Sequence, residues 1–291
     1  MEYDLFLGCV IPARLPFLEA SARKVFHKLG IGLKDVEGFS CCPDPTGIEL
    51  IDHNTWLALG ARNLSLVNNN REIISLCSGC VETLKGVNYS INNSIEKKEE
   101  INNILKRVNK SYTGNVQVKH FAEVIYENID KVRECVKIPL EGFKIAAHYG
   151  CHYLRPSKVI KWDDPLDPSS IDEIIDALGA ESINYDLKME CCGNPVEKSD
   201  EDLSLQMINN KLNAISKAGA NCVTLVCPAC FQQFDFKQRT LNKKQKNNYN
   251  LPIFYLSELI ALAFGFNAKN LGFRYHRTRP IDLFNEIGFS S

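Results

Sequence analysis

The sequence predicts an α/β protein made of two homologous domains, each a parallel sheet covered by helices. A set of cysteines occurs twice along the chain, β-branched apolar runs precede cysteines in both halves, and amphipathic stretches separate those runs. Buried strands that alternate with helices form parallel sheets, because each helix returns the chain to the same end of the sheet. We divide the 291 residues into domains 1–140 and 141–291, related by a pseudo-twofold axis.

The cysteine pattern is the clearest sign of a repeat. Two adjacent pairs and two Cys-x-x-Cys motifs recur at an offset of 150 positions, and a lone cysteine precedes each set. The first set is Cys9, Cys41, Cys42, Cys77 and Cys80, and the second is Cys151, Cys191, Cys192, Cys227 and Cys230. Four matches at one offset indicate a duplicated unit.

Short apolar runs lead into these cysteines. "YDLFLGC" and "FKIAAHYGC" precede the lone cysteines, while "EIISLCSGC" and "CVTLVCPAC" contain the Cys-x-x-Cys motifs. Such runs are typical of buried strands. Since ligands of parallel sheets gather outside the carboxyl ends of the strands, we expect all ten cysteines to converge there.

Amphipathic helices are predicted at 14–29 and 54–68 in the first half, and at 171–178 and 201–218 in the second. "VKHFAEVIYEN" and "PIFYLSELIAL" extend the repeat, with Glu123 matching Glu258. The segment 88–115, rich in Asn, Lys and Glu, is predicted to be an exposed helix inserted into the first half.

The composition excludes several classes of function. Thirty-four Lys and Arg residues against 35 Asp and Glu residues give a net charge of −1, so nothing favours nucleic acid or an anionic membrane as partner. The N-terminal "MEYDLFLGCV" has no basic region and does not predict a signal peptide. The apolar stretch "FYLSELIALAFGF" contains Glu258 and is too short to span a bilayer. We therefore expect a cytoplasmic protein.

Twelve cysteines in a reducing compartment favour metal binding over disulfides. Zinc needs four ligands, but each half offers five, and neighbouring cysteines do not easily reach one tetrahedral ion. Thiolates also suit iron–sulfur clusters, for which a fifth cysteine indicates a spare thiol or an opened, non-cubane cluster. Zinc in one half or both, and a thioredoxin-type redox pair, remain alternatives. Cys135 is interpreted as a plain thiol and Cys222 as a core residue.

The pattern resembles that of the cysteine-rich CCG domain family. Its two-copy arrangement resembles the catalytic B subunits of heterodisulfide reductases from methanogens. The resemblance covers nearly the whole chain and includes "AAHYGCHYLRP", "MECCGNP" and "LVCPACFQQFD". It departs at Cys42-Pro43, where the second half has Cys192-Gly193. It implies two Rossmann-like domains.

The resemblance also implies a function. Each five-cysteine set would hold a non-cubane [4Fe-4S] cluster, and the substrate would be the mixed disulfide of coenzyme M and coenzyme B. One sulfur of the disulfide would go to each cluster. Electrons would come from a partner subunit with conventional [4Fe-4S] clusters, fed by a flavin subunit and a hydrogenase or formate dehydrogenase.

Four other residues are candidates for the reaction. His152, beside Cys151, is a plausible proton donor near neutral pH, whereas His148 fits a core role or the support of a ligand. Lys211 is a candidate donor or anion ligand, although a solvated helix face is the preferred interpretation. Arg14 and Arg155 follow the lone cysteines and would bind the anionic groups of the substrate.

Two other functions compete with a disulfide reductase. One is a cluster-bearing subunit of a flavin dehydrogenase acting on succinate, glycolate, lactate or glycerol 3-phosphate. The ferredoxin-type C-x2-C-x2-C-x3-C-P motif that several of those chains carry is absent from this sequence. The other is a non-catalytic zinc protein.

Overall fold

The chain forms two four-stranded parallel sheets in a computed structural model that describes residues 1–67 and 71–289. The first sheet has the order β2-β1-β3-β4 and the second the order β6-β5-β7-β8. The strands of the first are β1 (Glu2–Phe6), β2 (Gly32–Asp35), β3 (Glu72–Ser75) and β4 (Val118–His120). Those of the second are β5 (Lys144–His148), β6 (Glu181–Ser182), β7 (Cys222–Leu225) and β8 (Ile253–Tyr255). The predicted fold class is confirmed.

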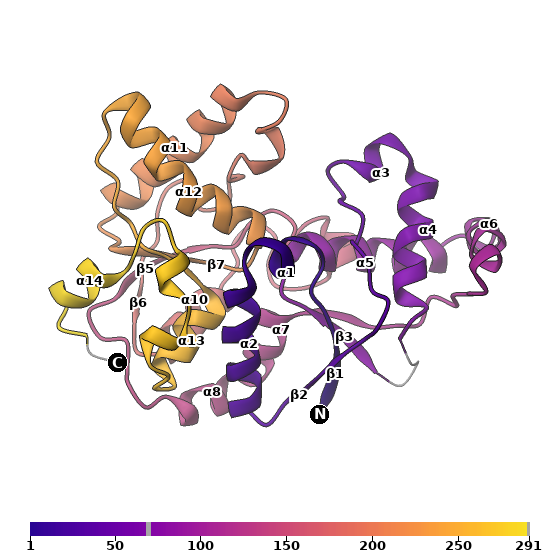
Figure 1. The fold of residues 1–291 in the computed structure, drawn as a ribbon, viewed down its shortest axis with the longest axis horizontal. Coiled ribbons are helices and arrows are strands. Elements are labelled where there is room, and N and C mark those ends of the chain that lie inside the picture. Colours follow the sequence, from indigo (N-terminus) through magenta and orange to yellow (C-terminus); the bar gives the residue numbers. More distant parts are fainter. Residues whose placement is uncertain (68–70, 290–291) are drawn as a thin grey trace.

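Helices connect the strands in both halves, which lie side by side in Figure 1. The first half has α1 (Val10–Arg14), α2 (Pro16–Lys28), α3 (Ile48–Ile51), α4 (His53–Leu64), α5 (Ser78–Asn92), α6 (Ile95–Leu105), α7 (Phe121–Glu127) and α8 (Ile129–Cys135). The second has α9 (Ser157–Ile160), α10 (Ser170–Ala177), α11 (Glu201–Lys217), α12 (Pro228–Gln245), α13 (Leu256–Ala263) and α14 (Ile281–Glu286). The four predicted amphipathic helices correspond to α2, α4, α10 and α11; residue 68 of the second lies outside the described residues.

The register of the two sheets defines which residues are equivalent. Phe6, the last residue of β1, lies opposite Ser75, and His148, the last residue of β5, lies opposite Leu225. Ser75 and Leu225 are themselves 150 positions apart. Phe6 and His148 therefore occupy the same place in the two halves.

Helices α4 and α11 also correspond, at a slightly different offset. Each begins after an aspartate whose side chain caps the helix: Asp52 accepts from Thr55 N at 3.1 Å and Asp200 from Leu203 N at 2.9 Å. Their buried faces align at an offset of 148, so Asn63 matches Lys211. The repeat thus extends beyond the cysteines to helix caps and core positions.

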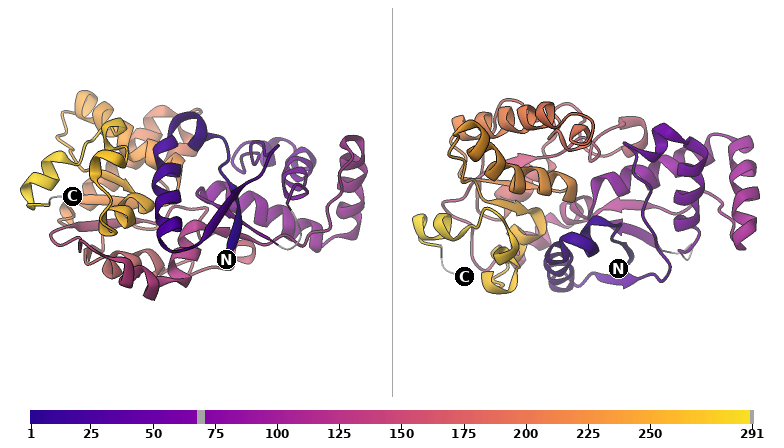
Figure 2. Two further views of the ribbon diagram at one scale, coloured as in Figure 1. Left: turned by 60° about the horizontal axis from the view of Figure 1, so that its bottom comes forward. Right: turned by 45° about the horizontal axis from the view of Figure 1, so that its top comes forward.

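One hydrophobic core runs through both halves. Leu18 and Phe26 of α2 belong to the same buried cluster as Phe231 of α12 and Leu259 of α13. Helices α2 and α13 pack together, and the buried hydroxyls of Ser21 and Ser257 are 2.7 Å apart. Figure 2 shows the two halves in contact from two further directions. The domain division at 140 and 141 remains a prediction.

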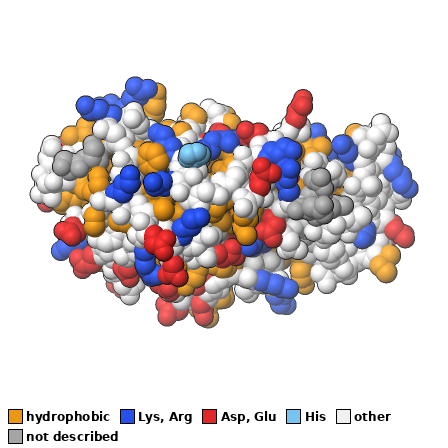
Figure 3. Space-filling view, turned by 90° about the horizontal axis from the view of Figure 1, so that it is seen from below, with side chains coloured by type: hydrophobic (Ala, Val, Ile, Leu, Met, Phe, Trp, Pro, Cys, Tyr) orange, Lys and Arg blue, Asp and Glu red, His pale blue; other side chains and the backbone are white. Residues whose placement is uncertain are grey.

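The outer parts of the molecule are less apolar. Helix α6 lies at one end of the molecule, where only Ile101 and Leu105 of its residues are buried, as expected for an inserted helix (Figure 1). Seen from below, the surface mixes basic and acidic side chains (Figure 3). Among the described residues, no helix is long and apolar enough to cross a membrane.

The two halves are joined at their centre by reciprocal contacts. His120, at the end of β4, donates from Nε2 to the carbonyl oxygen of Val226 at 3.0 Å, while its Nδ1 accepts from Ala122 N at 3.1 Å. Tyr255, at the end of β8, donates its hydroxyl to the carbonyl oxygen of Leu76. The two accepting residues immediately precede the Cys-x-x-Cys motifs and are 150 positions apart. Each half therefore fixes the backbone of the other half directly before its Cys-x-x-Cys motif.

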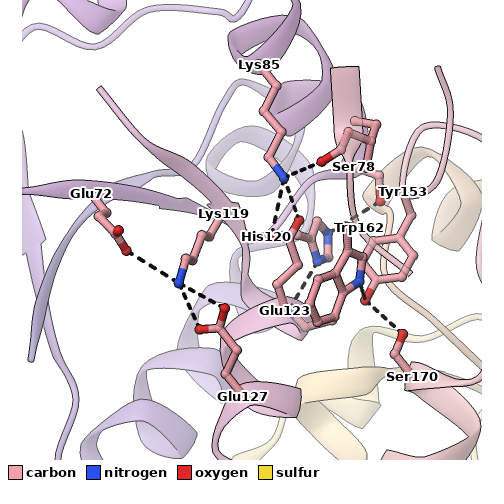
Figure 4. A network of polar contacts seen from close by, with 12 residues as sticks. Glu72, Ser78, Lys85, Lys119, His120, Glu123, Glu127, Tyr153, Trp162 and Ser170 are labelled. Atoms are coloured by element: carbon pink, nitrogen blue, oxygen red, sulfur yellow. Dashed lines mark hydrogen bonds and ion pairs between the residues drawn. The ribbon is translucent and has the colours of Figure 1, made fainter. Parts of the chain in front are cut away.

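His120 is an uncharged ring with ion pairs of its own half nearby. Burial lowers the pKa of His120 to about 3, so the ring is neutral and its tautomer follows from its two partners. Helix α7, which follows His120, is fixed by an ion pair of 3.0 Å between Lys85 and Glu123 (Figure 4). Nearby, Lys119 forms ion pairs with both Glu72 and Glu127.

We predict that Tyr255→Phe lowers the free energy of unfolding by about 1–2 kcal/mol, because the carbonyl of Leu76 loses its buried donor. The same change should lower the metal content per chain, because Leu76 precedes Cys77. Tyr112→Phe is the matched control: it removes a buried hydroxyl that contacts Asn88 and Val116, away from the junction of the halves. Urea unfolding and elemental analysis measure both effects, and equal metal loss in the two variants would contradict the assignment.

Candidate metal centre

The ten repeated cysteines follow the carboxyl ends of strands, as the sequence predicts. Cys9 and Cys151 come after β1 and β5, and the two CysCys pairs lie on the loops after β2 and β6. Cys77 is the residue that caps the N-terminus of α5, and Cys227 occupies the same place on α12. Six strands, β1, β2 and β3 in the first half and β5, β6 and β7 in the second, therefore bring the two sets together.

Both sets line a single cavity of about 270 Å³. The cysteines in its wall are Cys9, Cys41, Cys42, Cys77, Cys80, Cys151, Cys192, Cys227 and Cys230. Cys191 is not in the wall, but its thiol interacts with those of Cys151 and Cys192. All twelve cysteines of the chain are free thiols.

The thiols form a continuous series across the two halves. Cys9 and Cys41 have their sulfurs 3.7 Å apart. From Cys41 the interactions pass through Cys42, Cys80, Cys77, Cys227, Cys230, Cys192 and Cys191 to Cys151. The two sets meet at the thiols of Cys77 and Cys227. The two sites therefore face one another rather than opening on opposite sides.

Glycines make room for the sulfurs. Gly8 and Gly150 precede the lone cysteines with φ of +67° and +76°, in the left-handed region that glycine adopts without strain. A Cβ at Gly8 would lie 2.7 Å from Cys80 Sγ, and one at Gly150 would lie 3.7 Å from Cys230 Sγ. The space beside Cys80 thus exists only because residue 8 has no side chain.

Buried polar side chains hold the loops that carry the CysCys pairs. Asn63 donates to the carbonyl of Cys41 at 3.0 Å and accepts from Ser40 N at 3.0 Å. Lys211, its equivalent, donates to the carbonyls of Leu187 and Lys188. The interpretation of Lys211 as part of a solvated face is wrong: it is fully buried, because α11 turns it toward this loop.

The electrostatic surroundings favour negative charge on two sulfurs of the second half, those of Cys227 and Cys191. The pKa of Cys227 is held well below its usual range by the thiols of Cys230 and Cys77, and further by the backbone N–H groups of Cys230 and Ala229. The pKa of Cys191 is lowered by the thiols of Cys151 and Cys192, with a further hydrogen bond of 3.4 Å from Gly193 N. Pro43, which stands where Gly193 does, has no N–H to offer.

His152 lies in the wall of the cavity, beside a carboxyl from the other half. Its Nδ1 is 3.8 Å from Oε2 of Glu82 on α5. Neither atom has a hydrogen-bond partner within residues 1–67 and 71–289. Burial raises the pKa of Glu82 to about 8, with Glu49, Cys42 and Asp44 adding to the rise. The pair is an arrangement that can hold and pass a proton at the cavity wall.

His148 lies deeper in the second half. It is 1% exposed, and one of its ring nitrogens lies within 4.8 Å of the sulfurs of Cys192 and Cys230. The sequence favoured a core residue or one that supports a ligand, and its burial agrees with both.

The remaining candidates lie outside the cavity wall. Arg14 is exposed and lines a second groove with four other arginines. Arg155 is exposed and donates to the carbonyl of Met189 at 3.2 Å. Their roles in binding substrate remain predictions. Cys222 is fully buried in β7, and Cys135 ends α8.

Some residues of the site were missed. Glu82 follows Cys80 by two positions on α5, while the corresponding residue of the second half is Gln232. That difference within the repeat was a usable signal. The sequence indicates no role for His120 or Tyr255, because nothing near them in the chain shows that they reach across to the other half.

The donor set suits metals that bind thiolates. Ten free, convergent thiols fit iron–sulfur clusters or zinc, whereas hard cations such as Mg²⁺ prefer oxygen. The fold and the cysteines together define a duplicated, thiolate-rich metal protein.

Comparisons with known proteins identify the family. Residues 3–85 and 145–235 match the cysteine-rich domain (CCG), and the chain belongs to this family. It is 36% identical to the B subunit of the ferredoxin:CoB-CoM heterodisulfide reductase of Methanosarcina mazei, over 98% of this chain and 97% of that one. It is 34% identical to a protein of Archaeoglobus profundus that is named for its likeness to the B subunit of heterodisulfide reductase, over 93% of each chain.

A third relative has a different name. The 8-methylmenaquinol:fumarate reductase membrane anchor subunit of Wolinella succinogenes is 32% identical, over 94% of this chain and 96% of that one. A solved structure of a hypothetical protein from Helicobacter pylori shares the fold, with a TM-score of 0.79 at 18% identity. That match covers 96% of this chain but only 52% of the other.

Proposed function

We propose that the chain is the catalytic subunit of a disulfide reductase that converts the coenzyme M–coenzyme B heterodisulfide into two thiols. The strongest support is that nine of the ten repeated cysteines line one cavity and that the two sets meet at Cys77 and Cys227. The names of several relatives, among them that of the Methanosarcina mazei protein, supply the substrate. In this proposal each set holds a non-cubane [4Fe-4S] cluster.

The reaction requires two electrons and two protons, because cleavage of the S–S bond leaves two thiolates that each take up a proton. Clusters held by the two cysteine sets would supply one electron each, and a partner iron–sulfur subunit would return those electrons, which the names of the relatives as reductase subunits favour. A flavin subunit and a hydrogenase or formate dehydrogenase remain the expected sources of electrons for that partner subunit. The cavity holds the disulfide between the two cysteine sets.

Proton delivery belongs to this chain's own residues. His152 is the proposed donor, because it lies in the cavity wall on the side of the second cysteine set. Glu82 orients the imidazole through its Nδ1 and leaves Nε2 for the substrate sulfur. Lys211 contributes by fixing the loop before Cys191, and the positive charge that it adds favours thiolate nearby.

A second function is favoured by one observation. The Wolinella succinogenes relative is named as part of a fumarate reductase, so a cluster-bearing subunit that passes electrons without breaking a disulfide also fits the family. In that case the cavity would hold clusters but bind no disulfide. A zinc protein is the third alternative, and metal analysis separates it from the other two.

We predict that the anaerobically purified chain carries about eight irons. Cys42→Ser and Cys192→Ser should each remove about half of the iron and abolish reduction of the heterodisulfide, because neither half completes a two-electron cleavage alone. Cys135→Ser, outside the repeat, is the control and should change neither quantity. Stoichiometric zinc with little iron would overturn the proposal.

We predict that His152→Ala lowers turnover by about 10²–10⁴-fold at unchanged iron content, because it removes a proton donor and no metal ligand. Glu82→Gln should reduce turnover less, since the amide still occupies the place beside Nδ1. The control is His27→Ala, an exposed histidine on α2. Loss of iron in His152→Ala would show that the side chain supports the metal instead.

A further inference from the structure

The two metal sites differ at one buried position that the repeat makes equivalent. Phe6 and His148 end the corresponding strands β1 and β5, and both are buried, at 0% and 1% exposure. The first half thus has a phenyl ring where the second has an imidazole. Since the ring of His148 packs on Phe234 at 4.8 Å, its place is fixed by the core.

The polar atoms of His148 lack partners. Neither Nδ1 nor Nε2 has a hydrogen-bond partner within the described parts of the chain, residues 1–67 and 71–289. A buried donor without an acceptor destabilises the folded state, so its presence calls for an explanation. The imidazole carries at least one N–H in either of its protonation states.

Sulfur is the acceptor within reach. A ring nitrogen of His148 and the sulfurs of Cys192 and Cys230 lie within 4.8 Å of one another. Gly150 lies beside both groups, because a Cβ there would be 3.9 Å from Nε2 and 3.7 Å from Cys230 Sγ.

We propose that His148 donates its N–H to a sulfur of the second metal centre and makes that centre easier to reduce than the first. This rests on the proposed clusters. Hydrogen bonds to cluster sulfurs raise the reduction potential, because they stabilise the extra negative charge of the reduced state. Phe6 offers the first centre no such bond. A duplicated scaffold thereby carries two centres of unequal potential.

The test exchanges the two residues. His148→Phe copies the first half and keeps a ring against Phe234, while Phe6→His makes the reciprocal change. Anaerobic redox titration followed by electron paramagnetic resonance gives the potential of each centre, and Cys42→Ser identifies the second centre by removing the first. We expect His148→Phe to lower the potential of the second centre at unchanged iron content, and Phe6→His to raise that of the first.

Two results would overturn the inference. One is an unchanged potential of the second centre in His148→Phe with full iron content, which leaves the proposed clusters standing. The other is a strong nitrogen coupling of the second centre in the parent chain, lost in His148→Phe, because the imidazole would then be a metal ligand and not a donor. A chain without iron refutes the proposed function itself, so the two failures are distinguishable.

A second, independent observation is a groove lined by five arginines. The groove has a volume of about 610 Å³ and lies between the junction of α1 and α2, helix α12, and the segment before α14. Its arginines are Arg14, Arg239, Arg274, Arg277 and Arg279, all exposed. None of them forms an ion pair within 4.0 Å with a carboxylate of residues 1–67 or 71–289.

The arginines are held by contacts that leave their charge available. Arg274 stacks over the ring of Tyr275 at 4.7 Å, and Arg277 lies over Phe236 at 5.4 Å. The nearby carboxylate of Asp235 accepts from the backbone N–H groups of Arg277 and Thr278, at 2.7 and 2.8 Å, and so anchors the segment. With a net charge of −1 for the whole chain, this concentration of positive charge is a local feature.

The groove adjoins the helices that carry the cysteines. Arg14 ends α1, which begins after Cys9, and Phe236 lies on α12, which begins after Cys227. Val10 and Gln232, one helical turn earlier on each helix, line the cysteine cavity. A molecule bound in the groove therefore lies directly beside the metal sites.

We infer that this groove binds an acidic segment of the protein that delivers electrons, which deepens the proposed function. Arginine and aromatic residues are enriched at protein interfaces, and Tyr275 is 56% exposed in the groove. Several cations spread around one groove match several carboxylates along a polypeptide. Charge complementarity of this kind accelerates association and weakens as salt rises.

The experiment compares two electron donors on the same chain. Arg274→Glu/Arg277→Glu should lower heterodisulfide reduction driven by the co-purifying partner subunits at least tenfold, while reduction driven by methyl viologen stays at the parent rate. Arg107→Glu, an exposed arginine after α6, is the control for charge. An unchanged partner-driven rate would contradict the inference. So would a raised KM for the disulfide with methyl viologen, which would make the groove a substrate site. No reduction by the parent chain with either donor would refute the proposed function instead.

Discussion

The site depends on a reciprocal pair of hydrogen bonds, in which the last residue of β4 and the last residue of β8 each donate to the other half of the molecule. His120 and Tyr255 each donate to the carbonyl that precedes a Cys-x-x-Cys motif. These carbonyls lie at the carboxyl ends of the central strands, where the chain turns into a helix. Fixing them fixes the first cysteine of each motif, and so brings the thiols of Cys77 and Cys227 together. Neither half could position its own motif in the same way, since the donor always comes from its neighbour.

The scaffold residues repeat in the two halves, whereas the residues around the thiols differ between them. The strands, the helix-capping aspartates and the glycines before Cys9 and Cys151 are repeated, because both halves must deliver five thiols. The residues around the thiols are not repeated. Phe6 corresponds to His148, Pro43 to Gly193, and Glu82 to Gln232. The second set thus gains an imidazole and a backbone donor, whereas the first contributes the carboxyl beside His152. Two like halves can in this way hold unlike centres.

Much of this arrangement could be predicted from the sequence, because the spacing and the flanking residues of the cysteines indicate where they lie in the fold. Their common offset indicated the duplication, and the apolar runs before them indicated strands with cysteines at the carboxyl ends. The contact between the halves could not be predicted, since Tyr255 and Leu76 are far apart in sequence and meet only when two sheets pack. Lys211 was misjudged for a related reason. A lysine on an amphipathic helix is ordinarily exposed, and only the carbonyls of Leu187 and Lys188, which lie on another segment, make its burial favourable.

The density of thiols suits a metal group that is part of the folded state and not an addition to it. Buried polar atoms of Glu82, His148 and His152 have no hydrogen-bond partner within residues 1–67 and 71–289. His152 lies in the cavity wall, Glu82 lies beside it, and His148 lies close to Cys192 and Cys230. A core of this kind has neither the close packing of apolar side chains nor a closed hydrogen-bond network, both of which stabilise buried regions. Binding of a metal group deprotonates the thiols and couples its free energy to folding. The protein groups around the cavity are therefore arranged for a group with negative sulfur on its surface, which an imidazole N–H and helix N-termini both favour.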